Sequence, residues 1–379
     1  MSNSRRRMSV LVAGHAVNDL YQGAVPAVVP FLVAERHYGY VAAAGITVAA
    51  TLLSSVVQPL FGHLTDRRAM PWLVPVGMAV AGAGIGLSGL SESYLLTWLA
   101  IALSGLGVAA YHPEAARLAR RVAQDSHVGM SWFSVGGNVG FALGPVLVTP
   151  VLAFGGLAWS PLLAVPALVG STLTALALRG VHGAAASVAD RSGRDDWGQF
   201  SRLTVVIVAR SMVTFGLGTF LAIWVTQRVG GGPVAGAAAL VVLFGAGAAS
   251  TLLGGVLAGR WGRVRVLQVS YAAAVPAVAG IALVPGPLVY LMVALTAVAL
   301  YVPFSLHVTL GQDYLPNRVG TASGVTLGLA VSVGGLGSPV VGVVAGVWDL
   351  QWGLLSLVVL PVIAWAAARG LRSPRSMRA

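Results

Sequence analysis

Gly62-His63-Leu64-Thr65-Asp66-Arg67-Arg68 is repeated in outline 193 positions later, as Gly255-Val256-Leu257-Ala258-Gly259-Arg260-Trp261-Gly262-Arg263. Each copy begins with glycine at the end of an apolar run and passes into arginines. A sequence that repeats itself across half its length is built from two related halves. In a membrane protein, two such halves are typical of a transporter whose halves move around a site between them.

The composition is that of a membrane protein. Hydrophobic residues make up 57% of the chain and charged residues 9%, against about 25% charged residues in soluble domains. Twelve apolar runs are long enough to cross about 30 Å of hydrocarbon. They lie near 8–34, 42–61, 72–90, 94–116, 127–153, 158–179, 203–227, 234–257, 265–284, 287–310, 320–346 and 351–368. We therefore expect an all-α integral membrane protein with twelve transmembrane helices in two pseudo-symmetric six-helix bundles.

The basic residues predict the orientation. All 23 are arginines, and they gather at the two ends of the chain and in alternate loops. The opposite loops hold only Arg36 and Arg228. By the positive-inside rule, both termini are cytoplasmic. The net charge of +12 is thus a signal of topology, and we expect no nucleic acid as partner. We expect a monomer that spans the bacterial cytoplasmic (inner) membrane many times.

One long polar stretch, from Gly180 to Arg202, divides the chain. Asp195-Asp196-Trp197 could begin a short amphipathic helix on the membrane surface, and a plain linker is the alternative. We expect an N-terminal six-helix bundle, a cytoplasmic linker and a C-terminal six-helix bundle, at residues 1–180, 181–202 and 203–379.

The repeat extends along the chain. Tyr111-His112-Pro113-Glu114 has a counterpart in Tyr301-Val302-Pro303-Phe304, and Gln124-Asp125 has one in Gln312-Asp313. The counterparts keep the same order in both halves, which indicates duplication.

These motifs resemble those of the major facilitator superfamily, whose loop signature is similar to Gly-x-x-x-Asp-Arg-Arg at Gly62. The second copy departs from it at Gly259, where the acid is missing. Gly140-Phe141-Ala142-Leu143-Gly144-Pro145 resembles the core of the antiporter signature. His15 with Asn18–Gly23, and Tyr111–Ala115, resemble the fosmidomycin-resistance branch of exporters. The resemblance implies alternating access and proton-driven export of a drug.

A charge inside a membrane helix is costly and marks a transport pathway or a partner. Asp19 lies about 16 Å along the first helix, near mid-membrane, at 1.5 Å per residue. His15, Asn18, Asp19 and Gln22 are spaced i, i+3, i+4, i+7 and form one polar stripe. We expect Asp19 to face the interior and to couple transport to protons. A static hydrogen bond to a neighbouring helix is the alternative.

Three further groups are candidates for proton handling. Imidazole titrates near neutrality, so His15 and His112 are included, with a packing role for His112 as the alternative. Glu114 shares a helix face with Arg117 and Arg121. It either handles protons or belongs to a structural ion-pair network that includes Asp66.

The C-terminal half lacks these acids, since Phe304 stands at the position of Glu114. Its first helix carries Arg210 instead, and a guanidinium pairs bidentately with carboxylate, phosphate or phosphonate. Arg210 could instead be the counter-ion of Asp19, which would leave an apolar cavity for uncharged drugs, or reach the cytoplasmic face. The expected substrate cavity contains Asn18, Tyr21, Gln22, Tyr111, Arg210, Thr214, Phe220, Trp224 and His307.

The superfamily resemblance implies a cytoplasmic gate in which charges pair with neighbouring helix ends. The glycines and proline of the helix at 127–153 permit close approach and a bend, with general membrane packing as the alternative. The expected gate residues are Gly62, Asp66, Arg67, Arg68, Arg117, Gly140, Gly144 and Pro145.

Other function classes are not expected. The chain has no cysteine, which excludes thiolate metal sites and cysteine nucleophiles. It shows no phosphate loop, metal-ligand cluster or nucleophile–base pair, so we expect no enzyme, no metal and no cofactor besides the proton gradient. We expect a proton-coupled antiporter that exports a small molecule or drug, such as a fosmidomycin-like anion. The alternatives are a symporter that imports a metabolite and a non-transporting membrane sensor on the same fold.

Overall fold

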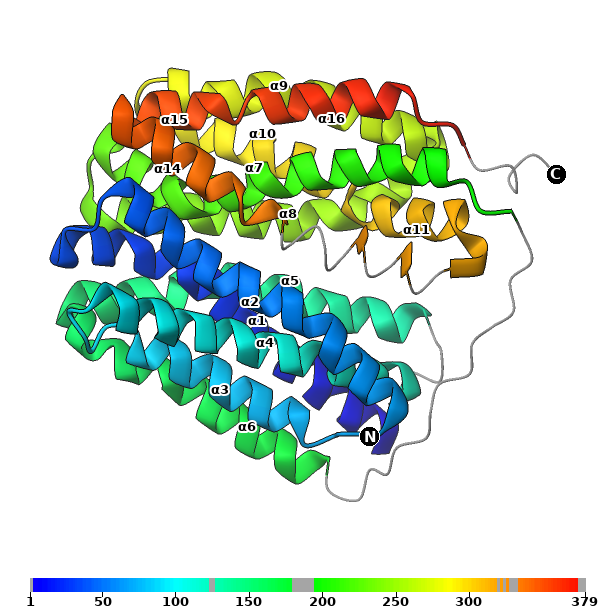
Figure 1. Cartoon of the computed structure of the whole chain (residues 1–379), viewed down its shortest axis with the longest axis horizontal. Helices are drawn as coiled ribbons and strands as arrows, with labels where there is room; N and C mark the ends of the chain where they lie inside the picture. Colours follow the sequence, from blue (N-terminus) through cyan, green and yellow to red (C-terminus); the bar gives the residue numbers. More distant parts are fainter. Residues whose placement is uncertain are drawn as a thin grey trace. The chain divides into compact units, whose positions relative to one another are not determined.

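The computed structural model of the protein describes the backbone of residues 3–122, 127–178, 194–318, 321–322, 325–326 and 333–373. Within these ranges it describes all side chains except those at 3–5, 52–56, 59, 63, 66–67 and 127–131. The described residues form helices and no strand. The chain divides into two compact units, Met1–Ser187 and Val188–Ala379, coloured from blue to green and from green to red in Figure 1.

The first unit begins with the longest helix of the described chain and alternates direction along the bundle (Figure 1). Its elements are α1 (Asn3–Arg36), α2 (Tyr40–Arg67), α3 (Leu73–Leu87), α4 (Tyr94–Val122), α5 (His127–Gly155), the 3-10 helix η1 (Leu157–Ala164) and α6 (Val165–Ala177).

The second unit has the same general plan with shorter pieces. Its elements are α7 (Trp197–Val229), α8 (Gly232–Trp261), α9 (Arg263–Leu283), η2 (Gly286–Leu288), α10 (Val289–Tyr301), α11 (Phe304–Tyr314), η3 (Pro316–Arg318), α14 (Gly337–Val347), α15 (Leu350–Ser356) and α16 (Val359–Arg369).

The length and apolar composition of the helices suit a membrane-spanning protein. Eight helices of the described chain are long and apolar enough to cross it, and shorter apolar helices lie at Tyr40–Thr51, Leu73–Leu87 and Gly337–Val347. Helix α1, with 34 residues, is also long enough, and it differs from those eight in carrying the polar stripe around Asp19.

Glycines allow α1 and α5 to lie in backbone contact. A Cβ atom at Gly140 would collide with the carbonyl oxygen of Ala16, and one at Gly144 would collide with the backbone of Gly23. The second unit repeats this arrangement, because a Cβ at Gly337 would collide with the carbonyl of Met212 in α7. Small residues permit such close helix packing in lipid. The first helix of each unit is therefore fixed against its partner by glycine.

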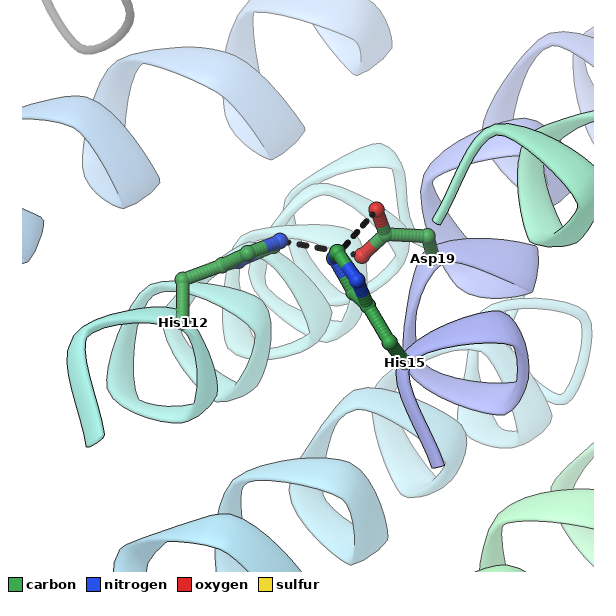
Figure 2. Close-up of side chains that lie close together, drawn as sticks. All are labelled: His15, Asp19 and His112. Atoms are coloured by element: carbon green, nitrogen blue, oxygen red, sulfur yellow. Dashed lines mark ion pairs between the residues drawn. The ribbon is translucent and has the colours of Figure 1, made fainter. Parts of the chain in front are cut away.

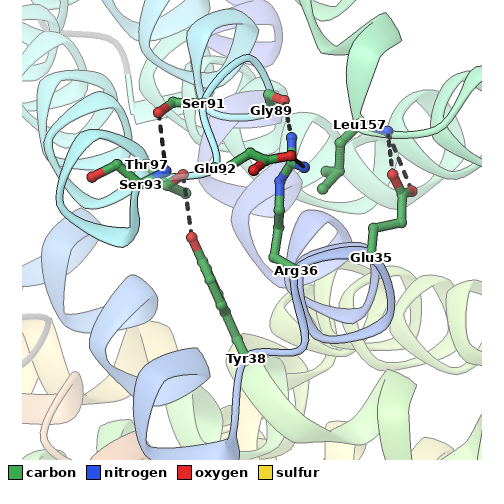
Figure 3. A network of polar contacts seen from close by, with 9 residues as sticks. All are labelled: Glu35, Arg36, Tyr38, Gly89, Ser91, Glu92, Ser93, Thr97 and Leu157. Carbon is green, nitrogen blue, oxygen red and sulfur yellow. Dashed lines mark hydrogen bonds and ion pairs between the residues drawn. The ribbon is translucent and has the colours of Figure 1, made fainter.

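Polar contacts hold one end of the first unit together (Figure 3). The Glu35 carboxylate accepts from the backbone N–H of Leu157, at 3.1 and 3.2 Å, where η1 begins. Arg36 donates to the Gly89 carbonyl at 3.1 Å and pairs with Glu92 at 3.3 Å. The end of α1 is thereby joined to the turn between α3 and α4 and to the start of η1.

Two boundaries differ from the sequence prediction. Helix α7 begins at Trp197 instead of residue 203, because the Asp196 carboxylate caps it by accepting from the Gln199 N–H at 3.0 Å. Residues 197–202 are therefore helical. The predicted helix at 287–310 is interrupted before Phe304, where Pro303 cannot continue the hydrogen-bond ladder. Its counterpart Pro113 lies inside an unbroken α4.

Gly144→Ala should lower the thermal unfolding temperature of the purified protein, because the new methyl group would meet the α1 backbone. Overpacking of this kind costs about 1–3 kcal/mol. The matched control is Gly245→Ala in α8, where an added Cβ meets nothing within 4 Å. Equal unfolding temperatures for the two variants in detergent would contradict the packing argument.

Candidate functional site

Two histidines flank one carboxylate inside the first unit (Figure 2). His15 and Asp19 lie one turn apart on α1, and His15 Nε2 is 3.2 Å from Asp19 Oδ2. His112 reaches the same carboxylate from α4, with its Nε2 3.0 Å from Asp19 Oδ1. We call these three residues the carboxylate–histidine cluster. The sequence predicted each as a proton-handling residue, and the structure brings all three together.

The other nitrogen of each imidazole is held by a backbone carbonyl. His15 Nδ1 lies 2.7 Å from the Phe133 oxygen in α5, and His112 Nδ1 lies 2.9 Å from the Val108 oxygen in α4. A carbonyl oxygen can only accept, so Nδ1 carries the hydrogen in both rings. In the neutral form of each ring, Nε2 is then an acceptor facing the carboxylate.

Neighbouring amides complete the carboxylate's surroundings. Asn18 Nδ2 and Gln22 Nε2 donate to Asp19 Oδ1 at 3.1 and 3.3 Å. The whole polar stripe predicted on α1 therefore converges on one carboxyl group. Among the described residues, the Asn18 Oδ1 atom and the Tyr111 hydroxyl are buried without a hydrogen-bond partner.

The cluster is enclosed by aromatic rings and by the α5 backbone. The Phe133 ring stacks on the His15 ring with a centroid distance of 4.1 Å. The Tyr111 ring also stacks on the His15 ring, with a centroid distance of 6.1 Å and an angle of 25° between the ring planes. A Cβ at Gly137 would lie 2.6 Å from Asp19 Oδ2 and 2.8 Å from His15 Nε2. Sequence reasoning missed Gly137; its signal was its place in a glycine-rich face with Gly136, Gly140 and Gly144.

The distances between the ligand atoms of the cluster also suit the binding of a small cation. The ligand atoms of His15, Asp19 and His112 all lie within 4.8 Å of one another. These three are therefore the described residues that could share one cation, although the sequence predicted no metal.

Glu114 lies apart from this cluster. It is fully buried, and its carboxylate accepts from Arg117 Nε at 2.9 Å and from Arg117 Nη2. Glu114 and Arg117 thus form an intrahelical ion pair, whereas the side chain of Asp66, the other predicted member of the network, lies outside the described residues. A buried pair of this kind leaves an uncompensated charge when one partner is removed.

The second unit places a buried guanidinium among aromatic rings. Arg210, 7% exposed, donates from Nε to the Leu300 carbonyl at 2.7 Å. Its guanidinium carbon lies 4.9 Å from the ring centroids of both Tyr301 and Phe304. Within the described chain no carboxylate pairs with it, and the sequence has no acidic residue between Asp196 and Asp313.

His307 adds a second polar pair near this arginine. The Tyr271 hydroxyl and His307 Nε2 are 3.0 Å apart and both residues are buried. Tyr271, Tyr301 and His307 all lie close enough to Arg210 to experience its charge. Donor groups thus collect in the second unit, whereas the carboxylate–histidine cluster belongs to the first.

Four other predicted cavity residues contribute to packing within their own unit. The Tyr21 hydroxyl donates to the Leu163 carbonyl at 2.8 Å and accepts from the Ala167 N–H at 2.9 Å. Trp224 donates to the Ile281 carbonyl at 2.8 Å, Thr214 donates to the Arg210 carbonyl at 3.1 Å, and Phe220 is fully buried.

The predicted gate is described only in part. The side chains of Asp66 and Arg67 lie outside the described residues, Arg68 is exposed, and Gly62 has open space around it. Pro145 lies within α5 beside the glycines that contact α1. The gate role of these residues stays a prediction.

Apolar helical bundles with buried charged groups are typical of membrane transport proteins. The sequence profile of the Major Facilitator Superfamily matches residues 11–339, and the chain belongs to this superfamily. It is therefore a multi-pass membrane transporter and not an enzyme. The predicted fold class, the major facilitator fold, is confirmed.

Curated relatives point the same way. The chain is 29% identical over 362 residues to the "Fosmidomycin resistance protein" of Escherichia coli (strain K12), covering 91% of this chain and 88% of that protein. It is 28% identical over 366 residues to the "Uncharacterized MFS-type transporter YfnC" of Bacillus subtilis (strain 168), covering 92% and 88%.

Solved structures share the fold at low identity. A bacterial homologue of the human lysosomal transporter Spinster, crystallised in an inward-facing conformation, matches with a TM-score of 0.81 and 16% identity over 97% of this chain and 98% of that chain. The nucleoside transporter NupG matches with a TM-score of 0.73 and 13% identity, over 98% and 100%. These likenesses concern the fold alone.

Gly137→Ala should lower the unfolding temperature, because the added methyl group would meet Asp19 and His15. The loss should be smaller in an Asp19→Ala background, where the carboxylate no longer occupies that space. Such coupling is expected of residues in contact. Gly245→Ala serves again as the control, and its effect should be the same in both backgrounds. A Gly137→Ala effect that is also the same in both would mean that the methyl group does not contact the cluster.

Proposed function

We propose that this transporter is a proton-coupled antiporter that exports a small anionic molecule across the bacterial cytoplasmic membrane. The observation that carries the proposal is the carboxylate–histidine cluster, in which one buried carboxylate faces two imidazoles. Ionisable groups inside a membrane bundle mark ion and substrate pathways. A carboxylate and imidazoles can exchange protons near neutral pH.

The geometry supports His112 as the route for protons into the cluster. Its side chain is 22% exposed, against 9% for the side chains of His15 and Asp19. In an alternating-access cycle, the cluster takes up protons on one side of the membrane and releases them on the other. Both termini are placed in the cytoplasm in this proposal, and the transporter works as a monomer.

The anionic substrate class is supported by Arg210. A buried guanidinium without a carboxylate partner in the described chain retains donors for a carboxylate, phosphate or phosphonate. Four side chains of its own unit already lie within 3.3 Å of the Asp19 carboxylate oxygens, which weighs against its being the counter-ion of Arg210. The resistance named for the Escherichia coli relative makes fosmidomycin a suitable probe.

Asp19→Asn should abolish gradient-driven transport and spare exchange. In proteoliposomes, an inside-acidic pH gradient should drive fosmidomycin accumulation through the wild-type protein. Asp19→Asn should reduce this accumulation by about ten-fold or more, the effect that general acid–base groups typically exceed, while exchange at equal pH continues. Asp349→Asn is the matched control, because the exposed Asp349 carboxylate caps α15 by accepting from the Trp352 N–H at 3.0 Å.

Other flux patterns would contradict the proposal. Accumulation driven only by an inside-alkaline gradient would establish the symporter alternative. Binding without flux under either gradient would indicate the sensor. Undiminished gradient-driven accumulation by Asp19→Asn would show that this residue is not the coupling acid.

Arg210→Gln should weaken fosmidomycin binding to the purified protein, measured by calorimetry. Hydrogen bonds to charged groups contribute about 1.5–3 kcal/mol, so the dissociation constant should rise by about ten-fold or more. Arg228→Gln is the matched control, since Arg228 also lies on α7, stacks on an aromatic ring at 5.3 Å and contacts a carbonyl. Equal losses in both variants would overturn the role of Arg210 as anchor.

A further inference from the structure

We infer that the carboxylate–histidine cluster binds two protons together, one at each contact between an imidazole and the Asp19 carboxylate. The inference deepens the proposed function, because it gives the number of protons that one coupling site holds. The number of protons bound to the cluster is argued from the geometry of the cluster alone. The number of protons transported per cycle rests on the proposed function.

The first step concerns the two Nδ1 atoms. Each faces a backbone carbonyl, that of Phe133 at 2.7 Å or that of Val108 at 2.9 Å. Both Nδ1 atoms therefore carry hydrogen, and neither neutral ring has a hydrogen left for Nε2. Without added protons, two Nε2 lone pairs would face carboxylate oxygens at 3.2 and 3.0 Å, which is repulsive at both contacts.

The second step counts the protons needed. The contacts use different oxygens, since His15 faces Oδ2 and His112 faces Oδ1. One proton can satisfy one contact and leaves the other as two facing acceptors. Two protons turn both contacts into hydrogen bonds. The formal charge then changes from −1, for a carboxylate with two neutral rings, to +1.

The third step assigns positions to the protons. Oδ1 already accepts from Asn18 Nδ2 and Gln22 Nε2, so the proton at this oxygen resides on His112 Nε2, which becomes the third donor. At Oδ2 no other described donor competes, and because an imidazole is a stronger base than a carboxylate, the second proton resides on His15 Nε2, which donates it to Oδ2. The amides therefore keep Oδ1 an acceptor, so the proton at this contact is carried by His112 and not by the carboxylate.

Few other charges oppose this occupancy. Helices α3 and α6 carry no ionisable side chain. The described side chains of α5 contribute none, so α5 presents only the Phe133 carbonyl and Gly137. On α4, the neutral phenol of Tyr111 is adjacent, while the Glu114 carboxylate is held by Arg117. The ionisable groups of α2 in the described chain are Tyr40 and, at its end, Arg68.

Nitrogen-15 solid-state NMR of the full-length protein in lipid vesicles tests the inference without any substrate. The chain has seven histidines, and His15→Gln and His112→Gln assign the two relevant signals. As the pH rises, both signals should change from doubly protonated rings to neutral rings with hydrogen on Nδ1. His307, whose Nε2 faces a hydroxyl, is the internal control and should not share this transition. In His112→Gln, one pH-dependent signal of the pair should be lost.

Three results would overturn the inference. One is a single cluster histidine that changes protonation in the wild-type protein. Another is a neutral ring with hydrogen on Nε2. The third is a stoichiometric metal ion found by elemental analysis of the purified protein, since a cation would then occupy the place of the protons. If neither variant folds, sequential nitrogen-15 and carbon-13 assignment of the wild-type spectra identifies the two rings, so the first two results can still be decided.

A flux measurement then separates this inference from the proposed function. In proteoliposomes at equilibrium and zero membrane potential, the logarithm of the fosmidomycin gradient should change by two units per pH unit in the wild type. It should change by one unit in His112→Gln. A wild-type slope of one would overturn two-proton coupling per cycle. Absence of fosmidomycin flux, with both histidines titrating, would overturn the proposed substrate and leave the two-proton site supported.

Discussion

No water is available inside a lipid bilayer to solvate Asp19, so the protein itself must satisfy this carboxylate. Its partners come from α1 and α4, and one of them, His15, is in turn fixed by the Phe133 carbonyl of α5. The carbonyl can reach His15 only because α5 lies against α1. That approach depends on glycine at Gly137, Gly140 and Gly144, where any side chain would collide. The environment of the buried carboxylate therefore depends on the glycines of α5.

The two halves kept this packing and diverged in their chemistry. Gly140 against Ala16 in the first unit corresponds to Gly337 against Met212 in the second. Tyr111 lies beside the cluster in the first unit, whereas its sequence counterpart Tyr301 lies under Arg210 in the second. Duplication thus supplied two equivalent scaffolds. One holds an acid with two bases, and the other holds a cation among aromatic rings.

Much of the fold was predictable because its signals are local. The apolar runs and the repeated loop motif each depend on a few neighbouring residues. The polar stripe on α1 was predictable for the same reason, since helical periodicity alone places His15, Asn18, Asp19 and Gln22 on one face. A helix that begins at Asp195-Asp196-Trp197 was one of two interpretations, because the polar residues around Asp196 are equally typical of a linker.

The convergence of His112 on Asp19 could not be predicted from the sequence. It depends on how α4 is rotated and shifted relative to α1, which distant side chains determine. Gly137 was missed because its place in a glycine-rich helix face indicates close helix packing and does not indicate contact with a carboxylate and an imidazole. Tyr21 and Trp224 look like cavity residues by type, and their hydrogen bonds to carbonyls within their own unit emerge only after the helices pack.

The direction of transport depends on how proton binding at the carboxylate–histidine cluster affects anion binding at Arg210. Neither site determines this coupling alone. A doubly protonated cluster and Arg210 are both positive, so electrostatics by itself makes protons favour the binding of an anion. Binding linkage is reciprocal, and the anion would equally favour protonation. Joint binding is the thermodynamic basis of symport, whereas antiport requires that proton and substrate exclude each other. An exporter of anions on this plan must therefore overcome the attraction through conformational change, with substrate binding selecting a state in which the cluster releases its protons.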